Sequence, residues 1–166
     1  MICCERIARR ISTVEEAMLA EVSVAFVIVA ICVVIHTSVL LVFARWMLGH
    51  LATNESRLGL THHAVLLILV FFIVIVLHMV ETALWASFYY WQSLFSDFET
   101  SLYFSLTSYT TIGFGDVVLP QKWRLLGALE GISGVLLCGL STAFIFAVVN
   151  LLFRMRTGLD SSALRS

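Results

Sequence analysis

Apolar residues are concentrated in three long runs along the chain. The runs cover residues 22–44, 64–91 and 125–153, and more polar segments separate them. A helix needs roughly 20 predominantly apolar residues to cross the hydrocarbon core of a bilayer, and each run reaches that length. The pattern therefore predicts three transmembrane helices, and the expected fold class is an all-α membrane protein.

The composition supports this class and argues against several others. Hydrophobic residues make up 60% of the 166 residues and charged residues 13%, about half the charged share of soluble proteins. The formal net charge is −1, so nothing indicates a nucleic-acid partner. The first run is too long for the core of a signal peptide. The four cysteines have neither metal nor disulfide spacing.

A short helix is expected in the semi-polar stretch after the second run. Ser96 or Asp97 can cap its start. Apolar side chains then recur at spacings of four and three, at Phe98, Leu102, Leu106 and Tyr109. A helix over residues 98–110 reaches only ~20 Å, so it must enter the membrane and turn back. The turn falls on TTIGFGD, residues 110–116.

The order of these elements resembles the pore module of potassium channels. An apolar span, a short re-entrant helix, a T-x-G-F-G-D loop and a second apolar span follow one another over about residues 64–153. The resemblance implies a potassium-channel pore fold with an outer helix, a pore helix, a selectivity filter and an inner helix. One additional N-terminal transmembrane helix precedes it here. The resemblance also implies a homotetramer, because four copies around an axis are needed to encircle an ion.

The resemblance assigns the ion-binding filter to Thr111, Ile112, Gly113, Phe114 and Gly115. Backbone carbonyls there would replace the water around potassium ions, and no other cofactor or metal is expected. Glycines at alternate positions allow the backbone dihedrals that turn successive carbonyls toward the axis. Ile112 and Phe114 are expected to point away from the axis and to wedge the loop against the pore helix. Asp116 would lie at the outer mouth.

Two positions depart from the commoner pattern of that family. Phe114 stands where tyrosine is commoner, although other members carry phenylalanine there, and Thr107 stands where some members have an acid. The partner of Asp116 must then be Tyr103, Thr107 or water. Tyr103, Thr107 and Thr110 are accordingly the expected supports of the filter.

The last run resembles the inner, pore-lining helix of the family. Gly127 and Gly131 have the small-xxx-small spacing that permits close helix packing in lipid. Gly134 is either a gating hinge or a packing notch, and Gly139 is a second candidate for a hinge. Ser141 and Thr142 lie further along the helix and are expected to line the cavity.

Among the ionisable side chains inside the apolar runs, His78, Glu81 and Glu130 lie at depths that predict a polar network behind the filter. A carboxylate at membrane depth is costly unless it is paired, hydrated or protonated, so it marks a functional site by default. The network is either a structural hydrogen-bond cluster or a pH sensor. Metal catalysis is disfavoured, because His78 and Glu81 supply only two ligands.

The expected organisation has seven segments. They are an N-terminal amphipathic segment (1–21), the extra transmembrane helix (22–46), a cytoplasmic connector (47–63), the outer helix (64–92), the pore helix with filter and outer loop (97–120), the inner helix (121–153) and a short cytoplasmic tail (154–166). An outward-facing filter places the C-terminus in the cytoplasm, in agreement with Arg154, Arg156 and Arg165. The arginines at positions 6, 9 and 10 disagree with the external N-terminus that follows.

Three functions stay open on the sequence alone. The first is passive, potassium-selective conduction through a homotetramer in a membrane, expected to be a bacterial inner membrane. The second is a less selective monovalent cation channel of the same architecture. The third is a non-conducting membrane subunit that keeps the pore fold as an interaction module. None of them is an enzyme; membrane lipid is an expected partner, and a separate regulatory subunit is unidentified.

Overall fold

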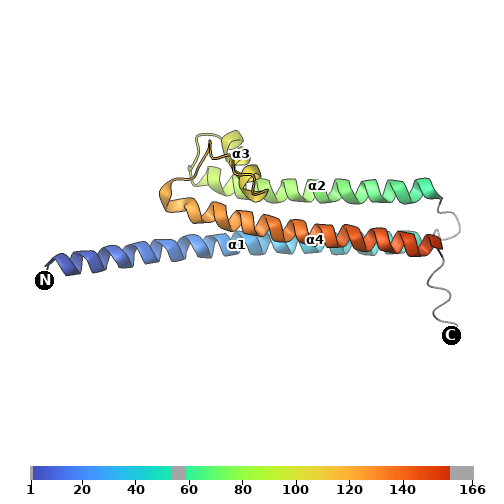
Figure 1. Ribbon diagram of the computed structural model, residues 1–166, viewed down its shortest axis with the longest axis horizontal. Coiled ribbons are helices and arrows are strands. Elements are labelled where there is room, and N and C mark those ends of the chain that lie inside the picture. Colours follow the sequence, from blue (N-terminus) through green and yellow to red (C-terminus); the bar gives the residue numbers. More distant parts are fainter. Residues whose placement is uncertain (1, 54–58, 158–166) are drawn as a thin grey trace, which may run out of the picture. The chain divides into compact units, whose positions relative to one another are not determined.

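The computed structural model describes residues 2–53 and 59–157, and this part of the chain is helical without a strand. Three long helices are α1 (Ile2–Thr53), α2 (Leu60–Trp91) and α4 (Arg124–Thr157). The short helix α3 (Phe98–Tyr109) follows α2, and a 3-10 turn, η1 (Gln121–Trp123), leads into α4 (Figure 1). The expected all-α class is confirmed.

Each long helix contains a stretch that is long and apolar enough to cross a membrane. These stretches are Met18–Ala52, Thr61–Trp91 and Gln121–Met155. Large apolar side chains such as Phe26, Phe72 and Phe146 are exposed along them, as expected for helices whose backbone groups are satisfied internally and whose surface meets lipid. Helix α3 has 12 residues, about 18 Å at the usual rise, so it cannot cross.

The helices extend beyond the segments expected from the sequence. No break separates residues 2–21 from the first apolar run, and α1 continues past residue 46 to Thr53. Helix α2 begins at Leu60 rather than at 64, and α4 continues past 153. Met47 and Leu51 pack with Leu66 in an apolar cluster, and this packing extends the helices into the expected connector. Residues 54–58 of that connector and 158–166 of the expected tail lie outside the described residues.

The chain divides into two compact units with different interiors. The first unit comprises Met1–Val34 and Val80–Leu136, and the second comprises Ile35–Met79 and Leu137–Ser166. The second unit has apolar clusters, in which Phe43, Val70 and Leu152 are typical members. The first unit contains α3 and buries polar and aromatic side chains together, among them Glu81 and Glu130. Polar groups in an apolar interior need partners, so this first unit holds the candidate functional site.

Candidate functional site

Helix α3 is fixed at its start by the side chain of Asp97. Asp97 Oδ1 accepts a hydrogen bond from the backbone N–H of Thr100 at 2.7 Å, and Oδ2 accepts from the hydroxyls of Thr100 and Ser96 at 2.9 and 2.7 Å. These donors, led by the backbone N–H of Thr100, lower the pKa of the Asp97 carboxyl. The sequence-based choice of Ser96 or Asp97 as the cap is thereby decided in favour of Asp97.

The stretch after α3 takes up a left-handed backbone at alternate residues. The φ angle is 59° at Thr111, 53° at Gly113 and 80° at Gly115. This conformation costs roughly 1–2 kcal/mol for a residue with a side chain and is freely accessible to glycine, which explains the two glycines. The N–H groups of Thr111 and Gly113 bond back to the carbonyls of Ser108 and Thr107 at 2.9 and 3.0 Å. These bonds tie the stretch to the end of α3.

Asp116 is held from α3 by Tyr103. The Tyr103 hydroxyl donates to Asp116 Oδ2 at 2.8 Å, and this hydrogen bond raises the pKa of Tyr103. The hydroxyls of Thr107 and Thr110 donate instead to carbonyls of their own helix, at 3.0 and 2.6 Å. Of the partners expected for Asp116, Tyr103 is therefore the one that the structure brings to it, whereas Thr107 supports the stretch through its backbone carbonyl.

The side chains of Ile112 and Phe114 are largely uncovered in the single chain, being 58% and 70% exposed. The hydrogen bonds that tie this stretch and Asp116 to α3 come from backbone N–H groups and from the Tyr103 hydroxyl, and neither apolar side chain takes part in them. The packing of Ile112 and Phe114 against the pore helix therefore stays a prediction.

Behind α3, buried hydroxyls contact two buried carboxyl groups. The Tyr109 hydroxyl donates to Glu81 Oε2 at 2.5 Å, and the Tyr89 hydroxyl donates to Glu130 Oε2 at 2.7 Å. Ser105 Oγ lies 2.5 Å from Glu130 Oε1. All five side chains are buried. Glu81 and Glu130 belong to the polar network expected from the sequence. In the structure both are hydrogen-bonded to residues of α3, Glu81 to Tyr109 and Glu130 to Ser105.

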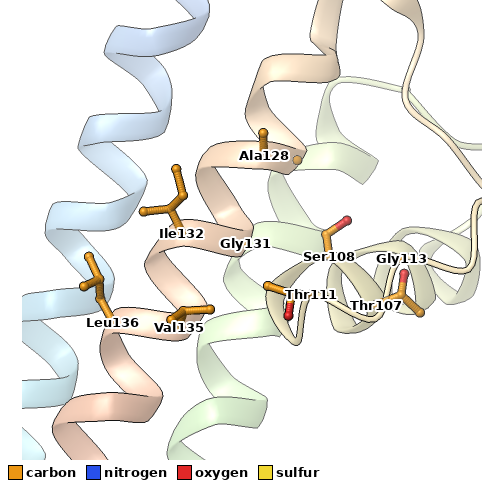
Figure 2. A pocket seen from close by; sticks show the side chains of 10 residues that line it. Thr107, Ser108, Thr111, Gly113, Ala128, Gly131, Ile132, Val135 and Leu136 are labelled. Atoms are coloured by element: carbon orange, nitrogen blue, oxygen red, sulfur yellow. The ribbon is translucent and has the colours of Figure 1, made fainter.

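A groove of about 500 Å³ lies beside the left-handed stretch. Figure 2 shows that its lining comes from two segments, residues 107–113 on one side and residues 127–136 of α4 on the other. On α4 it presents the exposed apolar side chains of Ile132, Val135 and Leu136. An exposed apolar surface next to a polar loop is typical of a contact surface for another molecule.

Comparison with known protein families identifies the family to which this chain belongs. A family model described as ion channel matches residues 64–150, just over half of the chain. The chain belongs to the ion channel family. The match includes most of α2 and α4, all of α3 and the left-handed stretch, while α1 precedes it. Comparisons with curated proteins and with solved structures gave no match.

In the channel, α4 packs closely against α3 at glycines, where an added side chain would force its neighbours to shift. A Cβ atom at Gly127 would lie 3.0 Å from the ring of Phe104, and one at Gly131 would lie 3.1 Å from the carbonyl oxygen of Ser108. Real Cβ atoms rarely come so close to another heavy atom. The close packing expected from the small-xxx-small spacing is confirmed at both positions.

Gly134 is the most closely packed of these glycines. A Cβ atom there would lie 2.0 Å from the carbonyl oxygen of Tyr109, a distance that would force the channel's helices apart. The geometry therefore favours a role for Gly134 in close helix packing over a role as a gating hinge. Gly139 has no atom within 4 Å of its would-be Cβ, so its role as a hinge stays a prediction.

His78, in the channel's second unit, forms a hydrogen bond with Ser141 of the inner helix α4. Ser141 Oγ lies 3.1 Å from His78 Nε2 and 3.0 Å from His36 Nε2. Ser141 is therefore buried beside two histidines, which differs from the cavity lining expected of it. Thr142 is exposed and its hydroxyl donates to the Cys138 carbonyl at 2.9 Å, so its place at a cavity stays a prediction. No pattern in the sequence points to His36, because a lone histidine in an apolar run has no diagnostic spacing.

Proposed function

We propose that the channel conducts potassium selectively through residues 111–115 of four copies arranged around an axis. The observation that carries the proposal is the left-handed backbone at Thr111, Gly113 and Gly115. In an extended segment, alternation between left-handed and ordinary backbone turns successive carbonyl groups the same way. A row of carbonyl oxygens from each of four copies supplies the ligands of a dehydrated potassium ion.

The surface of the single chain supports assembly from several copies. Ile112 and Phe114 are large apolar side chains beside the filter, and neither is covered within the chain. The groove between residues 107–113 and 127–136 adjoins them. A second copy seated in this groove would cover all of these residues, and closed rotational symmetry then leads to a ring. Lipid would surround the rest of the helical surface.

The proposed transport is passive and needs no chemical step. Potassium would shed water on entering the filter, pass between rings of carbonyl oxygens and leave down its electrochemical gradient. Asp116, held by Tyr103 at the end of the filter, would raise the local concentration of cations at the outer mouth. This orientation places the C-terminus in the cytoplasm, in agreement with the arginines after α4, and a bacterial inner membrane remains the proposed location.

Reconstitution into liposomes tests the proposal. Wild-type protein should release potassium from loaded liposomes, and Gly115→Ala should reduce the flux by more than about tenfold. A Cβ at Gly115 meets no atom within 4 Å, but φ is 80°, so the substitution adds roughly 1–2 kcal/mol of backbone strain in every copy. Gly49→Ala is the matched control, because a Cβ there also meets no atom within 4 Å and Gly49 lies inside helix α1, ahead of the residues matched by the ion channel family.

The outcomes separate the alternatives. Sodium flux equal to potassium flux would favour a less selective cation channel of the same architecture. Absence of any flux from correctly folded wild-type protein would favour a non-conducting subunit. Loss of flux in Gly49→Ala to the same extent as in Gly115→Ala would show that the left-handed backbone is not what matters.

A further inference from the structure

Glu130 is a fully buried carboxyl group, and its hydrogen-bond partners within residues 2–53 and 59–157 are hydroxyl groups and not cations. Its side chain has two contacts among the described residues, the Tyr89 hydroxyl at 2.7 Å on Oε2 and Ser105 Oγ at 2.5 Å on Oε1. Neither residue is a cation. An ionised carboxylate in an apolar interior is strongly disfavoured when no cation or water compensates it, whereas the neutral acid avoids most of that penalty.

The hydrogen atoms at Ser105 lead to the same conclusion. Ser105 Oγ carries one hydrogen, yet it lies 2.8 Å from the Thr82 carbonyl oxygen and 2.5 Å from Glu130 Oε1. A carbonyl oxygen can only accept, so Ser105 donates to Thr82. The contact between Ser105 and Glu130 then needs a hydrogen from Glu130. With a proton on Oε1, each of the contacts to Thr82, Ser105 and Tyr89 contains one hydrogen.

We infer that Glu130 is a neutral carboxylic acid that donates its proton to Ser105 and thereby positions the pore helix. The chain of donors runs from Glu130 on α4 to Ser105 on α3 and on to the Thr82 carbonyl on α2. Ser105 lies one turn before Tyr109, the last residue of α3. Glu130 is thus a positioning residue, because it joins three helices directly behind residues 111–115, the proposed filter. Its expected effect on ion selectivity rests on the proposed function.

The other titratable groups near Glu130 do not supply a positive charge. Tyr89 comes from α2 and is already a donor to Glu130. Glu81, also from α2, is a second carboxyl and receives the hydroxyl of Tyr109 from α3. Cys32 from α1 is a thiol near both carboxyl groups and is likewise not a cation. Two ionised carboxylates in one interior would repel each other, which further favours a neutral Glu130.

Infrared spectroscopy of the full channel in lipid measures the proton directly. The wild type should show the carbonyl stretching band of a protonated carboxyl group, and this band should weaken in Glu130→Gln. Glu99→Gln is the matched control, because Glu99 is an exposed acid in the first turn of α3, and it should leave the band unchanged. A loss of carboxylate absorption in Glu130→Gln, with the carbonyl band intact, would overturn the inference.

Ion selectivity of the same variants tests the positioning role. A glutamine amide can donate to Ser105 and accept from Tyr89, so Glu130→Gln should keep the potassium-to-sodium preference within about threefold, while Glu130→Ala and Ser105→Ala should reduce it by about tenfold or more. Selectivity lost in Glu130→Gln as fully as in Glu130→Ala would contradict the role. A wild-type channel that shows the carbonyl band of a protonated carboxyl group but no preference for potassium would refute the proposed function. The inference that Glu130 is protonated would still stand.

Discussion

Gly134 lies where the inner helix meets the end of the pore helix. A Cβ atom added there would lie only 2.0 Å from the Tyr109 carbonyl oxygen, so no side chain fits without movement. We predict that Gly134→Ala destabilises the channel by roughly 1–3 kcal/mol through overpacking, despite the better helix propensity of alanine. Unfolding in detergent, followed by circular dichroism, measures this. Gly139→Ala is the control and should be neutral or stabilising. Equal stability of both variants, with impaired opening in Gly134→Ala, would restore the hinge interpretation.

The hydrogen bond between Tyr103 and Asp116 predicts a dependence on alkaline pH. The bond raises the pKa of Tyr103, so its contribution is complete below the ordinary tyrosine pKa of about 10 and is lost as pH rises through the raised value. Current through the wild type should therefore fall above pH ~10, while Tyr103→Phe should start lower and lack this step. Single-channel recording against external pH measures it, and identical pH profiles would contradict the assignment.

Single residues also show which contacts could be predicted from the sequence and which could not. The sequence restricted the protein partner of Asp116 to Tyr103 or Thr107, and the structure brings Tyr103. It did not show that Thr107 and Thr110 turn their hydroxyls to carbonyls of their own helix, because threonine makes such local bonds in many contexts. The contact of His36 with Ser141 joins residues 105 positions apart, and no local pattern indicates it.

At the scale of the element, Asp97 fixes the start of the pore helix. Its pKa is lowered by the N–H of Thr100, so its stabilising effect is present above the ordinary aspartate pKa of about 3.9 and is lost as pH falls through the lowered value. We predict that Asp97→Ala destabilises the helix at neutral pH and flattens this acid-side dependence, whereas Asp97→Asn keeps the acceptor for Thr100. Thermal unfolding against pH measures both, and equal stability of the two variants would contradict the cap.

The type and order of the helices could be predicted because hydropathy and capping are local properties. Three apolar runs and one short capped helix correspond to α1, α2, α4 and α3. Helix ends could not be predicted, since side-chain packing decided them. Met47 and Leu51 extend α1 because residues of α2 and α4 cover them, and a sequence does not display its tertiary contacts.

At the scale of the whole molecule, the proposed filter requires four copies of the chain. We predict that native mass spectrometry in detergent gives four times the 18.5 kDa chain mass. Val135→Trp, which fills the groove beside the filter, should lower the tetramer fraction by about tenfold, at a cost typical of overpacking. Val76→Trp, an exposed position on α2, is the control. A monomer or dimer in the wild type would contradict the proposed assembly.

Potassium selectivity is the central claim, and the reversal potential under bi-ionic conditions tests it most directly. Wild-type channels in a planar bilayer would separate potassium on one side from an equal concentration of sodium on the other. We predict a large reversal potential, with the sign expected when potassium permeates and sodium does not, because the carbonyls of residues 111–115 would select potassium. A reversal potential near zero would mean that sodium passes equally well and would contradict the account.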